Sequence, residues 1–314
     1  MADLTKVTVV GAGNVGSNTA RRAAEQELAD EVVMIDIVEG LPQGLALDIN
    51  QSSPVEGFET MVTGTNDYKD TADSDVAVIT AGLPRKPGMS RMDLLDTNAK
   101  IVTEVTENLV EHSPDAVLVV VSNPLDEMTH LTSLVSGFPK ERVVGMAGIL
   151  DSSRLRYFIA EKLGTAATQV EAMTLGSHGD QMVALPRHAT VDGKPLPDLV
   201  DDSSLSELFQ RTRDGGAEIV GYLKKGSAYY APSSAVVQMV AAIMRDADEV
   251  LPCCAWTTGQ YGISDVYLGV PARLGSGGVK EIVELELNAE ERGHLKDAAE
   301  AIRAKCKELD SVRG

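Results

Sequence analysis

Short and almost continuously apolar runs recur through the first half of the chain, at residues 7–10, 32–35, 76–79 and 117–121. A strand with one face in water alternates apolar and polar residues, whereas a strand covered on both faces is apolar throughout. Helix-like stretches, of which residues 14–28 are the first, separate these runs. Repeated strand–helix–strand units join by right-handed crossovers, so the sequence predicts an α/β fold with a doubly wound parallel sheet.

The pattern changes after about residue 144. A predicted helix over residues 151–163 is followed by short strands and glycine- or proline-rich turns, and then by longer helices over residues 205–223 and 233–248. A last helix carries one apolar stripe near the C-terminus. We therefore predict a first domain over residues 1–145 and a second, mixed α+β domain over residues 146–314, with a cleft between them.

The net charge restricts the class of partner. The chain has 28 Lys and Arg against 47 Asp and Glu, a net charge of −19, which disfavours nucleic acid and anionic membranes. No apolar run is long enough to cross a bilayer and no signal peptide is visible, so we expect a cytoplasmic protein. The three cysteines match neither a disulfide framework nor a zinc spacing, and no metal is expected.

A glycine-rich turn, GAGNVG at residues 11–16, joins the first predicted strand to the first predicted helix. Its glycines permit a tight turn and a close approach of the backbone to a pyrophosphate, which the free N–H groups at the start of the helix can bind. A purely structural glycine turn is the alternative. The strand–turn–helix context favours a Rossmann-type dinucleotide-binding domain.

Asp36 indicates which dinucleotide binds. It ends the second predicted strand, 20 positions after Gly16. Its carboxylate can accept hydrogen bonds from the ribose hydroxyls of the adenosine, and it would repel a 2′-phosphate by about 4 kcal/mol at about 4 Å and an effective dielectric constant of about 20. The sequence therefore predicts NAD rather than NADP.

Three side chains are candidates for acid–base chemistry and anion binding. His178 lies in the glycine-flanked segment 176–180, a turn that can present an imidazole to a cleft. Of the other four histidines, one lies near a predicted helix end and three lie in stretches without other polar residues converging on them. Asp151 and Arg154 are three positions apart on a predicted helix, so their side chains share a face. A surface ion pair is the simpler alternative for these two.

Two further segments follow predicted strands at their carboxyl ends, where doubly wound sheets bind ligands. Residues 81–91, AGLPRKPGMSR, form a predicted loop whose cations Arg85 and Arg91 are unusual in so acidic a chain. An exposed basic loop is the alternative. Residues 121–124, VSNP, place the amide of Asn123 where it could reach a substrate or a nicotinamide.

Together, GAGNVG, Asp36, GLPRKPGMSR, VSNP, LDSSR and GSHGD resemble the lactate/malate dehydrogenase superfamily, and especially the lactate-dehydrogenase-like branch of malate dehydrogenases. The resemblance runs from about Lys6 to the last helix. It implies NAD-dependent, reversible hydride transfer between (S)-malate and oxaloacetate. The first domain would bind NAD, and the second would bind the dicarboxylate substrate.

The resemblance also implies a role for each candidate. His178 would donate and accept the proton of the substrate oxygen, with Asp151 holding its imidazole and favouring the protonated form. Arg154 would bind the C1 carboxylate by two parallel hydrogen bonds. Arg91 would polarise the carbonyl, and Asn123 would donate a hydrogen bond to the same oxygen. The implied NAD-binding residues are Gly11, Gly13, Asn14, Val15, Gly16, Asp36, Asn98, Val121 and Asn123.

Arg85 decides between substrates in this resemblance, because its position faces the variable end of the substrate. A guanidinium there suits the distal carboxylate of oxaloacetate, by roughly 1.5–3 kcal/mol for a charge-assisted hydrogen bond. Lactate enzymes have an uncharged amide at this position. Ala228 agrees, since a small residue leaves room for a longer substrate.

Three other functions are weighed against this one. Arg85 disfavours a lactate or other 2-hydroxy-acid dehydrogenase. An NAD-dependent glycosidase needs a Cys/His metal site, and no cysteine neighbours a histidine. A non-catalytic NAD-binding protein should have lost part of the set of candidates, yet all of them are present. The resemblance further implies a homotetramer or dimer without the N-terminal arm of animal-type lactate dehydrogenases, and a place in the tricarboxylic acid cycle.

Overall fold

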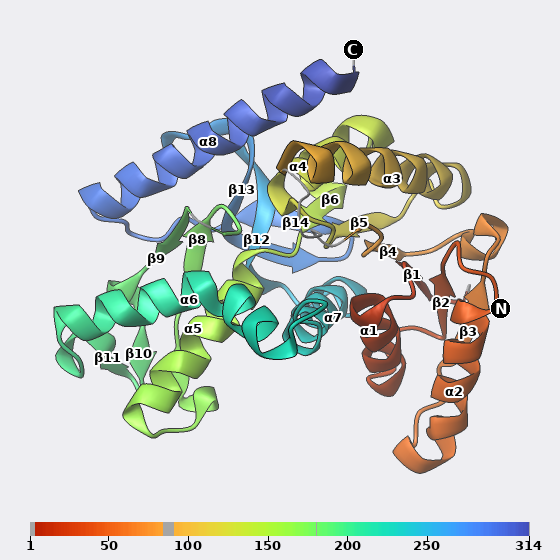
Figure 1. Cartoon of the computed structure of the whole chain (residues 1–314), viewed down its shortest axis with the longest axis horizontal. Coiled ribbons are helices and arrows are strands. Elements are labelled where there is room, and N and C mark those ends of the chain that lie inside the picture. The colour runs from red at the N-terminus through yellow and green to blue at the C-terminus, as the bar shows by residue number, and fades with distance from the viewer. Residues whose placement is uncertain (1–3, 84–90, 180, 314) are drawn as a thin grey trace.

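The computed structural model describes residues 4–83, 91–179 and 181–313, and a single large sheet runs through its centre (Figure 1). Six parallel strands lie in the order β3-β2-β1-β4-β5-β6 within these residues. Their bounds are β1 Lys6–Val10, β2 Glu31–Ile35, β3 Met61–Thr65, β4 Val76–Ile79, β5 Val117–Val120 and β6 Val143–Gly145. The direction of winding reverses between β1 and β4, so the predicted doubly wound parallel sheet is confirmed.

Helices cover both faces of this sheet, which explains why its strands are apolar throughout. Strands β4 and β5 are buried at every residue. One face packs against α1 (Asn14–Glu25), α2 (Leu41–Glu56) and α7 (Tyr230–Met244), and the other against α3 (Arg91–His112) and α4 (Leu125–Ser136). Helix α1 ends at Glu25 and α7 at Met244, three and four residues before the predicted ends.

The second half of the chain continues the same sheet with antiparallel strands. Strand β12 (Glu249–Thr258) pairs with β6 at Cys254 and Gly145, and with β13 (Ser264–Gly275) along its length. The remaining strands are β8 (Thr174–Gly176), β9 (Met182–Ala184) and β14 (Gly278–Ile282), with β7 (Val170–Glu171), β10 (Thr190–Val191) and β11 (Lys194–Pro195) in a small separate sheet. The predicted mixed α+β character of this half is confirmed.

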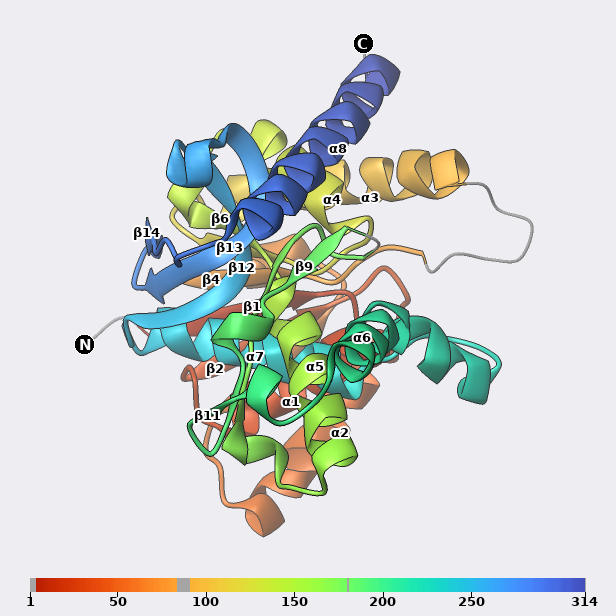
Figure 2. The ribbon, with the colours of Figure 1, turned by 90° about the vertical axis from the view of Figure 1, so that its left-hand side faces the viewer.

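Besides α7, the described part of the second half contains the α-helices α5 (Gly148–Leu163), α6 (Asp202–Leu223) and α8 (Ala289–Arg313). Helix α6 packs on α5. Helix α8 contacts β13 and, further along, α4 and α3, so that it crosses from the second half onto the first (Figure 2). Among the described residues, no helix has the length and apolarity of a membrane span.

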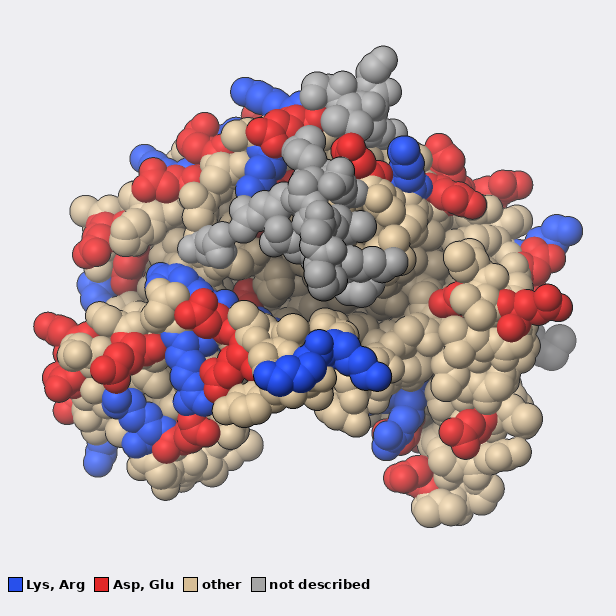
Figure 3. Space-filling view, viewed as in Figure 1, with Lys and Arg blue, Asp and Glu red and all other residues tan. Residues whose placement is uncertain are grey.

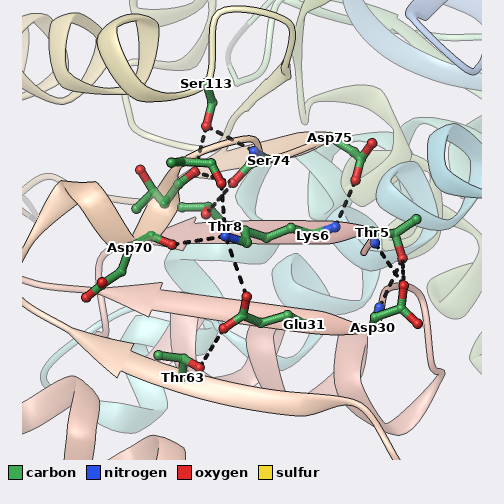
Figure 4. A network of polar contacts seen from close by, with 12 residues as sticks. Thr5, Lys6, Thr8, Asp30, Glu31, Thr63, Asp70, Ser74, Asp75 and Ser113 are labelled. Carbon is green, nitrogen blue, oxygen red and sulfur yellow. Dashed lines mark hydrogen bonds and ion pairs between the residues drawn. The ribbon is translucent and has the colours of Figure 1, made fainter. Parts of the chain in front are cut away.

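The amino-terminal edge of the sheet is closed by a polar network around Lys6 (Figure 4). The Lys6 ammonium donates a hydrogen bond to the carbonyl of Ala72 at 2.9 Å and lies 3.5 Å from the carboxylate of Glu31, while its backbone N–H donates to Asp75. These contacts tie β1 to β2 and to the segment before β4. The candidate site residues gather at the opposite, carboxyl edge.

Candidate functional site

The GAGNVG turn leaves β1 and enters α1 with two glycines that packing requires. Gly11 has a φ of +101°, and a Cβ atom there would lie 2.8 Å from Oγ1 of Thr80. A Cβ atom on Gly16 would lie 1.8 Å from the carbonyl oxygen of Gly11. The absence of a side chain at these two positions therefore allows the strand, the turn and the helix to pack closely.

Gly13 differs from them, and the difference tests whether the turn fits a dinucleotide. A Cβ atom on Gly13 would meet no protein atom within 4 Å. Gly13 is the N-cap residue of α1, so no capping side chain occupies the free N–H groups at the start of the helix. The first turn of α1, which contains Asn14 and Val15, carries no acidic residue. A pyrophosphate needs open space at a positive helix terminus, and no acidic side chain of the first turn of α1 competes for that space, so these residues fit NAD.

Asp36 lies beside the same turn, at the end of β2. One of its carboxylate oxygens, Oδ2, accepts a hydrogen bond from the backbone N–H of Ala12 at 2.7 Å, and Oδ1 accepts from that of Val38 at 2.9 Å. Each ionised oxygen can accept a further hydrogen bond. The backbone thus orients the carboxylate, which can still accept hydrogen bonds from the ribose hydroxyls.

The strand-end segments after β4 and β5 are joined by Asn98, which is buried on α3. Its Oδ1 accepts a hydrogen bond from the N–H of Leu83 at 2.8 Å, and its Nδ2 donates to the carbonyl of Asn123 at 2.6 Å. The amide of Asn98 therefore braces these two segments, and its direct contact with NAD stays a prediction. Val121 is buried in the same segment, whereas Asn123 is exposed and its side chain is accessible to a ligand.

His178, Asp151 and Arg154 come together although His178 is far from the other two in the sequence. The Nδ1 atom of His178 lies 2.8 Å from Oδ2 of Asp151, and Nη1 of Arg154 lies 3.4 Å from Oδ1 of the same carboxylate. Asp151 and Arg154 project from α5, and His178 follows β8. The predicted pairing on one face of a helix is present in the structure, and it is partly buried rather than a surface ion pair.

Two buried contacts keep this arrangement in register. Ser152, next to Asp151 on α5, accepts a hydrogen bond through Oγ from the backbone N–H of Thr174 on β8 at 3.0 Å. At the end of β8, Gly176 has a φ of +85°. A Cβ atom on Gly269 of β13 would lie only 2.2 Å from the carbonyl oxygen of Gly176. Strands β8 and β13 thus pack too closely for a side chain, which fixes the start of the turn that bears His178.

The charges around His178 favour its protonated form. Burial lowers the pKa of His178, but the carboxylates of Asp151 and Asp126 raise it further than burial lowers it, so the net shift is upward. Burial lowers the pKa of Arg154, and Asp151 opposes that shift; an arginine stays protonated in either case. Among the described residues, Nε of Arg154 has no hydrogen-bond partner. The site therefore places a proton donor, His178, near a guanidinium, that of Arg154, which can bind a carboxylate.

Two predicted residues are not placed by the structure. Arg85 belongs to residues 84–90, which lie outside the described residues. Arg91 begins α3, but its side chain is also outside the described part. Their predicted roles stay predictions. On the face shown in Figure 3, acidic side chains are dispersed and interspersed with basic ones rather than gathered into one patch.

Comparison with family models places this geometry among known proteins. Residues 5–145 match the NAD-binding domain of lactate/malate dehydrogenase, and residues 149–312 match the α/β C-terminal domain of lactate/malate dehydrogenase. The chain belongs to the lactate/malate dehydrogenase family. The family resemblance inferred from the sequence is confirmed, and the reading as an NAD-dependent glycosidase is set aside.

Several members of this family are similar over almost the whole chain. A malate dehydrogenase of Salinibacter ruber is 52% identical over 308 residues, which cover 98% of each chain. A solved structure of malate dehydrogenase from that organism has a TM-score of 0.94 at 50% identity, covering 98% of this chain and 99% of the other. A malate dehydrogenase of Plasmodium falciparum solved with NADH has a TM-score of 0.91 at 32% identity, covering 98% and 99%.

The fold alone does not separate the two activities of the family. A lactate dehydrogenase of Cryptosporidium parvum, solved with lactic acid and NAD, has a TM-score of 0.95 at 40% identity and covers 99% of each chain. That score is as high as those of the malate dehydrogenases. The choice of substrate must therefore come from side chains within the site.

The structure also adds a residue that the sequence analysis missed. Asp126, the second residue of α4, is buried, and its Oδ2 accepts a hydrogen bond from the backbone N–H of His178 at 3.1 Å. The only signal in the sequence is the pair of acidic residues Asp126 and Glu127, which follow the strand-end VSNP segment after Leu125. Acidic residues at the start of a helix are usually exposed to solvent and stabilise the helix through its dipole, so this signal is weak.

Proposed function

We propose that the chain is an NAD-dependent malate dehydrogenase that interconverts (S)-malate and oxaloacetate. The observation that carries the proposal is the partly buried arrangement in which Asp151 contacts both His178 and Arg154, within a chain 52% identical to a malate dehydrogenase. The chemistry that NAD supplies when bound is the donation or acceptance of a hydride at C2 of the substrate. The residues of the chain supply binding, orientation and the proton.

His178 moves the proton. Because Nδ1 is engaged by Asp151, the Nε2–H of the imidazolium is the group that donates to the carbonyl oxygen of oxaloacetate. In the reverse direction, neutral Nε2 accepts the proton of the malate hydroxyl. Asp151 keeps the ring oriented in both directions and stabilises the imidazolium.

Arg154 binds the C1 carboxylate. A guanidinium can form two parallel hydrogen bonds with a carboxylate, and such a pair fixes the orientation of the substrate. Asp151 and the neighbouring helix α6 hold the side chain of Arg154 in place before the substrate binds. We propose that Asn123 donates to the reacting oxygen and that Arg91 stabilises the charge developing on it.

Arg85 gives the substrate preference in this proposal. Its guanidinium would pair with the distal carboxylate of oxaloacetate, and it would be left unpaired by pyruvate. Ala228 is half-buried in the segment between α6 and α7, and its small side chain supports the proposal that a longer substrate fits there. Lactate dehydrogenase is the second candidate, since a lactate dehydrogenase is among the structures most similar to the chain.

The domain organisation and assembly are part of the same proposal. The division into an NAD-binding domain over residues 1–145 and a substrate domain over residues 146–314 is supported by the two family models, which leave only residues 146–148 between them. A homotetramer or dimer is supported by the exposed apolar side chains Leu47 and Val55 on α2. We further propose a cytoplasmic enzyme of the tricarboxylic acid cycle. Sedimentation velocity would test the assembly, and a monomer at micromolar concentration would contradict it.

The experiment that tests the activity compares kcat/KM for oxaloacetate and for pyruvate with NADH, in the wild type, in Arg85→Gln and in Lys86→Gln. We expect the wild type to prefer oxaloacetate by several orders of magnitude. Arg85→Gln should narrow that preference about tenfold to a hundredfold, because it removes one charge-assisted hydrogen bond. Lys86→Gln removes a charge from the same loop and should leave the preference nearly unchanged.

The other outcomes are equally informative. Equal activity on the two substrates would refute the malate assignment and leave the hydride chemistry standing. No oxidation of NADH with either substrate would contradict the enzymatic function itself.

A further inference from the structure

Asp126 is a buried carboxylate that the proposed mechanism leaves without a role. Asp126 lies at the start of α4 and is only 3% exposed. Its Oδ2 accepts the backbone N–H of His178 at 3.1 Å, while Asp151 holds the imidazole ring of the same residue from α5. Two carboxylates from two different helices thus hold one histidine, one by its main chain and one by its ring.

The surroundings of Asp126 compensate its charge only in part. The hydroxyl of Ser177 and the thiol of Cys254 on β12 face the carboxylate and lower its pKa, as does His178. Glu127, the next residue, is also buried, and it raises the pKa of Asp126. The ammonium of Lys305 on α8 lies 3.4 Å from the carboxylate of Glu127.

Burial therefore dominates. It raises the pKa of Asp126 to about 6, ahead of the effect of Glu127. The group is still ionised above pH 7, so the protein keeps a negative charge in its interior next to the turn that carries the reactive imidazole. An uncharged side chain could accept the same backbone hydrogen bond without the cost of burying a charge. The charge itself thus requires an explanation.

We propose that Asp126 is a positioning residue for the hydride-transfer reaction: it anchors the backbone of the His178 turn, and its negative charge favours the imidazolium form. The inference rests on the proposed function, in which His178 donates a proton to the substrate. Among the residues that the structure describes, the charged groups that act on His178 are Asp126 of α4, and Asp151 and Arg154 of α5. Asp126 adds to Asp151, and Arg154 opposes both.

The role has a consequence that a purely structural contact would lack. Removing the charge of Asp126 lowers the pKa of His178, since one of the two carboxylates favouring the imidazolium is lost. Oxaloacetate reduction needs protonated His178, so its decline at high pH moves to lower pH. Malate oxidation needs neutral His178, so its rise with pH also moves to lower pH. Loss of packing alone would reduce both rates without moving either profile.

The decisive variant is Asp126→Asn, which keeps the shape and an acceptor for the backbone N–H but removes the charge. Glu127→Gln is the matched control, because it removes the adjacent buried charge, which pairs with Lys305 instead. The pKa of His178 is measured by NMR titration of the imidazole Cε1–H signals in protein without added NAD or substrate. The chain has five histidines, and the His178→Gln variant assigns the signal.

We expect Asp126→Asn to lower the pKa of His178 by about one pH unit, the usual effect of a charge a few ångströms away, and Glu127→Gln to change it by less than about 0.3. Both pH profiles of kcat/KM should move with the NMR value in Asp126→Asn. An unchanged pKa of His178 in Asp126→Asn would overturn the electrostatic role, whatever the rates are.

Asp126→Leu separates the anchoring role, because it removes both the charge and the hydrogen-bond acceptor. We expect Asp126→Asn to retain at least tenfold more kcat/KM than Asp126→Leu. Equal kcat/KM in a folded Asp126→Leu would overturn the anchoring role, and if Asp126→Leu does not fold, the Asn variant still decides the electrostatic one. A wild type inactive on oxaloacetate and pyruvate would refute the proposed function, while the NMR titration would still test the effect of Asp126 on His178.

Discussion

Gly215 lies against the side chain of Arg154, so closely that a Cβ atom on Gly215 would be 3.1 Å from Cδ of the arginine. Gly215 is buried in the interior of α6, where glycine costs about 1 kcal/mol relative to alanine. The contact explains that cost, because α6 must approach α5 closely to enclose the guanidinium. The helix thereby fixes the group that we propose binds the C1 carboxylate.

Gly215→Ala should therefore impair substrate binding rather than folding. The added methyl group forces Arg154 to move by a few tenths of an ångström, and we expect the KM for oxaloacetate to rise about fivefold, or about 1 kcal/mol, with a smaller change in kcat. Gly221→Ala is the control, since a Cβ atom there would meet nothing within 4 Å on the same helix. Steady-state kinetics decide, and similar KM values in the two variants would refute the steric argument.

The hydrogen bonds of Asp36 lead to a prediction on cofactor choice. Asp36→Asn keeps an acceptor for the N–H of Ala12 but removes the charge that repels a 2′-phosphate. We expect the ratio of kcat/KM for NADPH to that for NADH to rise at least tenfold, since the repulsion is worth up to about 4 kcal/mol at close range. Glu39→Gln removes an exposed charge from the same segment and should leave the ratio unchanged. An unchanged ratio in Asp36→Asn would show that the discrimination lies elsewhere.

The bracing role of Asn98 is tested by stability. Asn98→Ala leaves the N–H of Leu83 and the carbonyl of Asn123 without their partners, which should cost about 2 kcal/mol in the free energy of unfolding. Asn108→Ala on the same helix removes only a hydrogen bond to the carbonyl of Glu104 near the surface, and it should cost less than about 1 kcal/mol. Urea denaturation measures both. Equal losses would mean that Asn98 does not brace the strand ends.

The parallel half of the fold could be predicted because burial on both faces makes each strand a continuous apolar run. The β12–β13 hairpin could not, since proline normally argues against the interior of a strand. In the structure Pro252 and Pro271 stand directly opposite each other. Opposed residues of an antiparallel pair either both bond or both do not, so two prolines can share a position where no N–H is needed. Neither proline by itself shows that the other stands opposite it, so the local sequence argues against both strands.

Prediction of the site depended on the same distinction between local and distant information. Asp151 and Arg154 share a helix face, and His178 was recognised by its glycine-flanked turn. Their meeting depends on the contacts between α5 and β8, which only the folded chain shows. The contact of Asn98 with NAD stays a prediction, and only the folded chain shows that its amide also bonds to the backbone. Asp126 was missed because its burial against the turn of His178 is a tertiary effect that the local sequence does not encode.

The buried charge of Asp126 also predicts how stability depends on pH. Its pKa is raised from 3.8 to about 6 in the folded protein, so the folded state binds this proton more tightly than the unfolded state does. The stability gained from that proton is fully present below about pH 4 and is lost as the pH rises through about 6. The loss amounts to up to about 3 kcal/mol at neutral pH.

Asp126→Asn should therefore be more stable than the wild type at pH 8, even though it is the less effective enzyme. The gain should be up to about 3 kcal/mol, and it should shrink as the pH falls from about 7 to about 4, where the wild-type carboxyl group is also neutral. Urea denaturation of both proteins at pH 8, 6 and 4.5 measures the difference. A difference that is independent of pH would show that Asp126 is not buried as a charge. A gain confined to high pH would mean that the chain gives up stability to keep this carboxylate beside His178, as expected of a residue kept for its effect on the reaction.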